Sequence, residues 1–216
     1  MTRLFRISSA TAIALGVLTA GMLLNTQKGR AESGDDGGYS DGSDQSKIQI
    51  GMNIAPVQLN LKGKNRSRVG MGSYLVNAVG GCNDCHTWRK TGPNAPSNYE
   101  NGGDPFLGQP EKIYTAGYLA GGRDFGPFRS RNLTPDSTGK VADGYSNFKE
   151  IIRHGTDFDH LFGSAPLQVM PWPVYRNMTD NDLQAIYEYL TSIPCVEGNP
   201  GESLATPDGT VTHRCH

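Results

Sequence analysis

The segment Cys82–His86, which reads Cys-Asn-Asp-Cys-His, constrains the fold of this chain more than any other stretch of its sequence. Two cysteines separated by two residues and followed directly by a histidine form the attachment pattern for a covalently bound haem. Thiols at this spacing can reach the two vinyl groups on one porphyrin edge, and the next residue can place its imidazole on the iron. The pattern therefore predicts one haem c, bound through Cys82 and Cys85, with His86 as the proximal iron ligand.

Other uses of this cysteine pair receive less support from the sequence. A redox-active dithiol needs a βαβ context, whereas a helical pattern leads into Cys82. A structural zinc site needs two more ligands, and the candidates His213 and His216 stand far along the chain at a spacing tighter than usual. A disulfide between Cys82 and Cys85 would close too small a ring for ordinary geometry. Haem attachment remains the favoured interpretation.

The N-terminus has the three-part pattern of a secretory signal peptide. Arg3 and Arg6 give a positive start, residues 10–24 carry no charge, and Gly29-Arg30-Ala31 supplies small residues before a cut. The alternative is an uncleaved membrane anchor, although the apolar run is short for a bilayer span. We therefore expect residues 1–31 to be a signal peptide or N-terminal anchor, and the protein to be periplasmic or otherwise extracytoplasmic, with a membrane tether as the alternative.

The two remaining cysteines, Cys195 and Cys215, suit such a compartment. In an oxidising environment a leftover pair is first interpreted as a disulfide. This bridge would tie down a C-terminal tail over residues 195–216. Thr212 stands where a second attachment motif ending at His216 would need a cysteine, so the tail holds no second haem.

The segments between the leader and the first helix are predicted from composition and alternation. Residues 32–46 hold one aromatic and no aliphatic residue, which indicates a flexible acidic linker. Residues 47–65 form an N-terminal arm in which apolar residues such as Ile48 and Ile50 alternate, as in an extended strand or an arm lying on the domain. The formal net charge is −1 and no Lys/Arg block is present, which excludes a nucleic-acid partner.

Three helices are predicted, with long loops between them. The first ends at Gly80-Gly81, the second covers about 146–154 and stops at Gly155, and the third begins after Thr179 and ends before Pro194. The apolar face of the first helix is expected to comprise Met71, Tyr74, Leu75, Ala78 and Val79. The loops 87–145 and 155–178 lack periodicity, which favours an all-α domain organised around a large buried cofactor.

Four blocks of sequence carry a resemblance to a known family. The chain resembles the haem domains of class I c-type cytochromes, in particular the cytochrome c subunits of membrane-bound alcohol, aldehyde and sugar-acid dehydrogenases. The resemblance covers roughly residues 66–194 and implies a class I cytochrome c fold with long loops around one covalently bound haem. The blocks are Gly72–Leu75 leading to Cys82–His86, Asn132–Asp136 with Thr138-Gly139, Met170–Pro173 with Tyr175-Arg176, and Leu183–Leu190 through Ile193-Pro194.

By this resemblance, Met170 is the distal iron ligand. Prolines at 166, 171 and 173 restrict the backbone around it, which suits a thioether held against iron. Three competitors remain open. Met178 stands in a hydrophobic-staple position before the third helix, and His154 or His160 would give bis-histidine ligation.

The resemblance also assigns neighbouring residues. In this family the terminal helices cross where a glycine admits an aromatic ring, which points to Gly72 and Tyr187. Trp172, Tyr175 and Arg176 are expected to line or cover the haem pocket.

Histidine–methionine ligation would leave no open position on the iron, so the chain is expected to be an electron carrier and not an enzyme. Relatives that act as dehydrogenase subunits usually carry three haem domains, whereas this sequence has one motif. We therefore expect an extracytoplasmic single-haem cytochrome that carries one electron at a time between redox proteins, namely a dehydrogenase, an oxidase or another cytochrome. The alternative is a haem-c subunit of an alcohol or aldehyde dehydrogenase complex.

Overall fold

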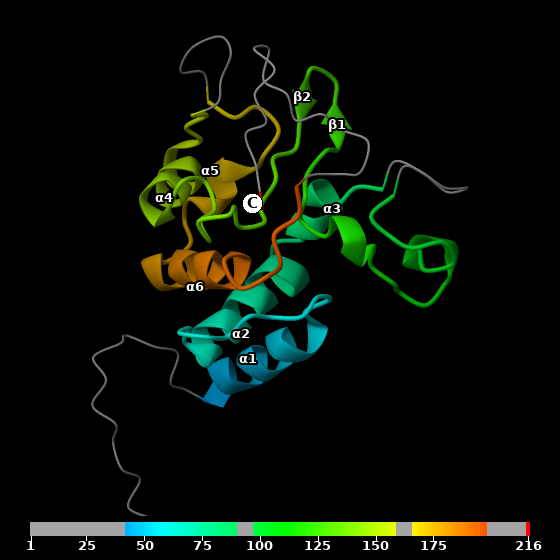
Figure 1. Cartoon of the computed structure of the whole chain (residues 1–216), viewed down its shortest axis with the longest axis horizontal. Helices are drawn as coiled ribbons and strands as arrows, with labels where there is room; N and C mark the ends of the chain where they lie inside the picture. Colours follow the sequence, from blue (N-terminus) through cyan, green and yellow to red (C-terminus); the bar gives the residue numbers. More distant parts are fainter. Residues whose placement is uncertain (1–41, 90–96, 159–165, 198–214) are drawn as a thin grey trace, which may run out of the picture. The chain divides into compact units, whose positions relative to one another are not determined.

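Helices form the framework of the structure, a computed structural model that describes residues 42–89, 97–158, 166–197 and 215–216. Helix α2 (Arg66–Tyr74) lies between α1 (Gly42–Ile54) and α6 (Asp180–Leu190) and contacts both (Figure 1). A π-helical turn, η1 (Leu75–Val79), continues α2 towards the short helix α3 (Cys82–His86). The cysteine motif therefore emerges directly from the helix crossing.

The remaining elements cover the long segments after α3. Helix α4 (Tyr145–His154) contacts α6 and the short helix α5 (Trp172–Tyr175). Two 3₁₀ turns, η2 (Pro105–Leu107) and η3 (Thr115–Gly117), precede an antiparallel ribbon of β1 (Asp124–Phe125) and β2 (Phe128–Arg129). The prediction of an all-α fold is therefore wrong in this one detail, because a four-residue ladder forms around the Gly126-Pro127 turn, too short to show a sequence period.

The two predicted helices of the second half are confirmed. α4 ends at Gly155, whose φ of 70° places it in the left-handed region where glycine is favoured. α6 begins after Thr179, and the side chains of Thr179 and Asp182 form a reciprocal capping box. The apolar pattern with its glycine stop located α4, and the capping box with the apolar pattern after it located α6.

The N-terminal segments differ from the prediction. α1 starts at Gly42, inside the expected flexible linker 32–46, and takes up the first part of the arm 47–65 as a helix instead of an extended strand. Its buried positions are Ile48 and Gly51, at helical spacing, and a Cβ on Gly51 would lie 2.7 Å from the Tyr74 backbone nitrogen. The arm does lie on the domain, but through a close backbone approach that alternation of apolar residues could not reveal.

The π-turn changes the buried face of the first helix. Met71 is buried as predicted, but Val79 is 56% exposed and Ala78 is exposed as well, while Val76 is fully buried. A π-turn inserts one extra residue, so positions after Leu75 are rotated relative to an ideal helix. The 3.6-residue period used for the prediction therefore fails beyond that point.

Gly72 lies where α2 crosses α6. A Cβ at this position would overlap the Ala185 carbonyl group and lie 2.7 Å from the Tyr189 Cβ. The predicted crossing at Gly72 is confirmed, but its partner is wrong: Tyr187 instead packs against Tyr145 and Phe148. The two positions differ because Tyr187 and Tyr189 are on different faces of α6.

We expect Gly72→Ala to lower the free energy of unfolding by about 3 kcal/mol, because the new methyl group has no room without separating the two helices. For a chain of this size that corresponds to a melting temperature roughly 6–12 °C lower. Thermal unfolding of the full chain checks this, with Gly42→Ala as control, since a Cβ on Gly42 meets nothing within 4 Å. Equal melting temperatures for the two variants would contradict the close crossing.

The predicted disulfide between Cys195 and Cys215 is present, with Cα atoms 5.7 Å apart. Asn132 and Thr134 hold the start of the tail, since the Asn132 side chain donates to the Val196 carbonyl (2.7 Å) and the Val196 amide donates to Thr134 Oγ1 (3.0 Å). The predicted signal peptide and most of the predicted linker lie outside the described residues. Across the described part of the chain, no helix has the length and apolar character needed to cross a membrane.

Candidate haem-binding site

Helix α3 brings the three residues of the attachment motif onto one turn. Cys85 and His86 follow Cys82 at i+3 and i+4, the spacings that share a helix face. Gly81, with a φ of 55°, supplies the left-handed residue that turns the chain from η1 into α3. The motif is therefore a preformed local structure and not an extended loop.

His86 is held in an orientation that suits an iron ligand. Its Nδ1 lies 2.7 Å from the Arg131 carbonyl oxygen. Because a carbonyl can only accept, Nδ1 must carry the proton, which leaves the lone pair of the neutral ring on Nε2. Burial lowers the pKa of His86, with the Arg131 bond opposing it, so the neutral ring is favoured. Histidines that bind a metal through one ring nitrogen typically donate the other N–H to a carbonyl or carboxylate in this way.

The two motif cysteines are free thiols in different surroundings. Cys82 is half-buried against the core and Cys85 is exposed. Burial raises the pKa of the Cys82 thiol to about 12, and repulsion from Cys85 and Asp84 adds to the effect. The Cys82 sulfur is therefore a neutral thiol, which is a poor nucleophile for dithiol exchange. Within the described ranges, no three His, Cys, Asp or Glu side chains group as a metal site would require.

Met170 and Cys82 pack against the same core cluster. Each is half-buried at the edge of that cluster, which comprises Val69, Val76, Tyr118, Leu119, Val141, Phe148, Ile152, Leu183, Ile186, Tyr189, Leu190 and Ile193. A hydrogen bond also joins the two segments, because the Tyr175 hydroxyl donates to the Gly80 carbonyl at 2.9 Å. Burial raises the pKa of Tyr175, and proximity to Cys82 and Cys85 adds to the rise. The segment carrying Met170 thus lies beside the attachment motif.

The competing distal ligands differ in their surroundings. Met178 is half-buried against the same core cluster, as its staple position predicts. His154 is exposed at the end of α4, 3.8 Å from Glu150. His160 lies outside the described residues. Of the three residues expected to line the pocket, Tyr175 lies next to the motif, Trp172 packs on Gly155, and Arg176 is exposed.

A strained loop supports the far side of the motif. Leu119 is fully buried at a φ of 57°, a conformation that costs a non-glycine residue free energy. The Leu119 amide donates to the Thr87 hydroxyl (2.8 Å), and the Leu119 carbonyl accepts from the Leu133 amide (2.8 Å). The Gly121 amide donates to the His86 carbonyl at 2.6 Å. Residues 119–133 therefore fix the end of α3 through backbone groups that leave no side-chain signal in the sequence.

A buried polar network also went unpredicted. The Tyr118 hydroxyl bonds to the Asn77 side chain and to the Tyr189 hydroxyl, the latter at 2.8 Å. Asn77 donates in turn to Ser73 Oγ (3.1 Å), and Ser73 Oγ donates to the Gly51 carbonyl (2.6 Å). Desolvation raises the pKa of Tyr118 well above its ordinary value. The network joins α1, α2, η1, α6 and the 118 loop behind the motif.

No protein-family model matches the chain. It is 30% identical over 146 residues to the gluconate 2-dehydrogenase cytochrome c subunit of Pantoea cypripedii, which covers 66% of this chain and 27% of that protein. It is also 30% identical over 146 residues to the cytochrome c subunit of alcohol dehydrogenase (quinone) from Gluconobacter oxydans (67% of this chain and 27% of that protein).

The fructose dehydrogenase cytochrome subunit of Gluconobacter japonicus is 29% identical over 127 residues, which cover 58% of this chain and 21% of that protein. The chain is therefore a relative of dehydrogenase cytochrome c subunits. The resemblance predicted from the four sequence blocks is confirmed. The names of these relatives also agree with an electron-transfer component and not a catalytic subunit. The chain spans about a quarter of the length of the curated relatives it matches.

Proposed function

We propose that this chain is a single-haem c-type cytochrome with a class I fold that works outside the cytoplasm. Cys82 and Cys85 would hold the haem through thioethers, and His86 and Met170 would be its axial ligands. One observation carries the proposal: His86, oriented by its hydrogen bond to the Arg131 carbonyl, shares a helical turn with the free thiols of Cys82 and Cys85. When bound, the haem supplies the one-electron redox chemistry.

The residues of the chain suit the binding of such a group. His86 presents Nε2 as a lone pair, Cys82 offers a thiol at the core edge, and the Met170 segment closes beside the motif through the Tyr175–Gly80 bond. With both His86 and Met170 holding the iron, no position would be left for a substrate, which would favour electron transfer. The Cys195–Cys215 disulfide supports an oxidising compartment.

A second candidate function is that of a haem-c subunit held in a dehydrogenase complex. The names of the three relatives favour it, since each is the cytochrome subunit of a dehydrogenase. The two functions differ in whether the cytochrome leaves its partner between turnovers. Size-exclusion chromatography of a native extract, stained for haem, distinguishes a free carrier from a stable complex.

The experiment that tests the proposal is haem analysis of the full chain, expressed with its leader and the haem-attachment machinery. We expect haem that survives denaturation, at one haem per chain, and a single one-electron wave in a potentiometric titration. The wave should lie at a relatively high potential, since a methionine ligand raises it. Haem that is lost on denaturation would overturn the proposal, and zinc analysis of the purified chain would then decide between the remaining uses of the cysteines.

A further inference from the structure

The C-terminal end of α4 holds the Met170 segment from both sides. Upstream of Met170, the Leu167 amide donates to the Gly155 carbonyl at 2.8 Å. Downstream, the Trp172 ring packs on Gly155 so closely that a Cβ there would lie 2.7 Å from the Trp172 Cδ2 atom. Met170 therefore lies between two contacts to Gly155, the residue that caps the C-terminal end of α4.

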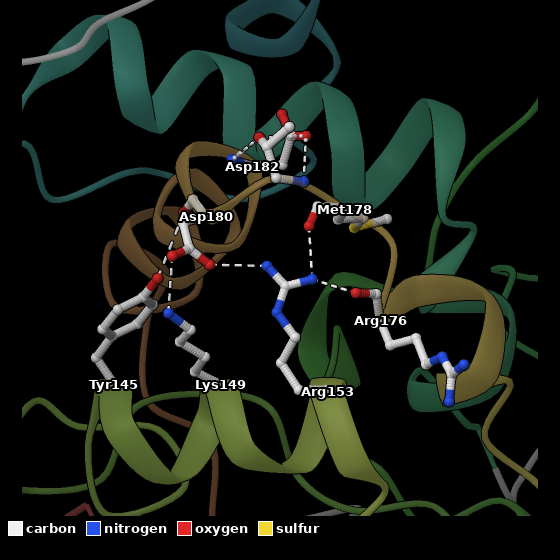
Figure 2. A network of polar contacts seen from close by, with 8 residues as sticks. Tyr145, Lys149, Arg153, Arg176, Met178, Asp180 and Asp182 are labelled. Atoms are coloured by element: carbon white, nitrogen blue, oxygen red, sulfur yellow. Dashed lines mark hydrogen bonds and ion pairs between the residues drawn. The ribbon is translucent and has the colours of Figure 1, made fainter.

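Arg153 makes a third contact, farther along the segment (Figure 2). Its Nη1 donates to the carbonyls of Arg176 and Met178, the latter at 2.6 Å, and its Nη2 pairs with Asp180 Oδ1 at 2.7 Å. The Arg176 side chain itself extends away from this network. One guanidinium group thus joins the end of α5 to the start of α6.

The geometry of this contact requires an arginine. The side chain is 21% exposed, so its bonds are partly shielded from water. A guanidinium group presents several donors in a rigid fork, whereas a lysine has a single flexible ammonium group. Both carbonyls lie just after α5. A lysine at position 153 would therefore retain the positive charge and part of the contact, but not the fork of hydrogen-bond donors.

We propose that Arg153 is a positioning residue that holds the Met170 segment in place, so that the Met170 thioether stays on the iron. The inference rests on the proposed role of Met170 as distal ligand. Arg153 acts through the backbone of 176–178 and does not itself touch the ligand. Its loss frees the downstream end of the segment, which raises the fraction of molecules in which the sixth iron position is open.

Lys149 provides a matched control. It stands one turn before Arg153 on α4 and pairs with the same carboxylate, Asp180 Oδ2, at 2.8 Å. Among the described residues its side chain contacts neither of the two carbonyls. A role that depended only on joining α4 to Asp180 would therefore be shared by both residues, whereas a role in holding the segment would belong to Arg153.

The test compares the haem-loaded full chain with Arg153→Gln, Arg153→Lys and Lys149→Gln. The readouts are the rate at which imidazole binds the oxidised protein and the weak long-wavelength charge-transfer band of a ferric haem–methionine bond. We expect Arg153→Gln to bind imidazole about tenfold faster and to weaken the band, since hydrogen bonds to two carbonyls are lost. Arg153→Lys should fall in between, and Lys149→Gln should stay within about twofold of wild type.

Each outcome bears on the proposal. A wild-type rate and band in Arg153→Gln would overturn it, as would an equal acceleration in Lys149→Gln. If Arg153→Gln does not mature with haem, Arg153→Lys decides by the same criteria. A Met170→Ala reference separates the two proposals: if it binds imidazole no faster than wild type, the distal-ligand assignment itself fails and the role of Arg153 fails with it. A fast Met170→Ala with an unaltered Arg153→Gln overturns the role of Arg153 alone.

Discussion

Replacing both Cys82 and Cys85 by serine is expected to abolish all haem that survives denaturation. A serine hydroxyl does not form the thioether to a porphyrin vinyl group, while α3 and the His86–Arg131 bond remain possible. Haem-peroxidase staining of the denatured protein measures the effect, with absorbance of the native protein as a second readout.

The other two cysteines offer the matched control. Cys195→Ser with Cys215→Ser removes the disulfide that ties the tail and leaves α3 intact. This variant should lose about 3 kcal/mol of stability, by the loop-entropy argument, and keep its stained haem. Covalent haem in the Cys82/Cys85 variant, or its loss only in the Cys195/Cys215 variant, would contradict the assignment of the attachment site.

Replacing Met170 by alanine is expected to speed imidazole binding to the oxidised protein by about a hundredfold. In the wild type a competing ligand must wait for the thioether to leave, and an open state of about 1% lowers the apparent affinity and rate in that proportion. The reduction potential should fall as well, because the axial methionine that raises it is gone. Stopped-flow mixing and potentiometry measure the two effects.

Met178→Ala is the control for this variant. Both methionines are half-buried against the same core cluster, so both lose comparable apolar contacts on truncation. We expect Met178→Ala to lower stability and leave imidazole binding near the wild-type rate. The opposite order of the two variants would make Met178 the distal ligand, and no change in either would favour a histidine.

The parts of the site that could be predicted are those whose chemistry is local. The Cys82–His86 motif gives the proposed attachment residues by itself, although no helix was expected there, and Thr179 with Asp182 specifies the start of α6 through a capping box that spans four residues. Each of these signals is complete within one turn of helix. A reader of the sequence therefore needs no tertiary information to find them.

The parts that could not be predicted depend on backbone groups or on distant contacts. The Arg131 carbonyl orients His86, and any residue type at 131 would supply such a carbonyl. The carbonyls of Arg176 and Met178 likewise give no sequence signal that Arg153 binds them. The π-turn after Tyr74 and the Gly51–Tyr74 approach arise from tertiary packing, which overrides the helical and alternating periods used for prediction.

Gly51 of α1 and Gly70 of α2, where the two helices meet, fix the register of α1 on the domain. A Cβ on Gly70 would lie 2.8 Å from the Ile48 carbonyl oxygen, and one on Gly51 would collide with Gly70 in turn. Sliding α1 by one turn towards its C-terminus would carry Lys47 to the place of Gly51, where a side chain would collide with the Gly70 carbonyl. Helix α1 therefore packs on α2 in a single register. A one-residue insertion or deletion between 55 and 65 must then be accommodated within that connection, and the position of α1 on the domain does not change.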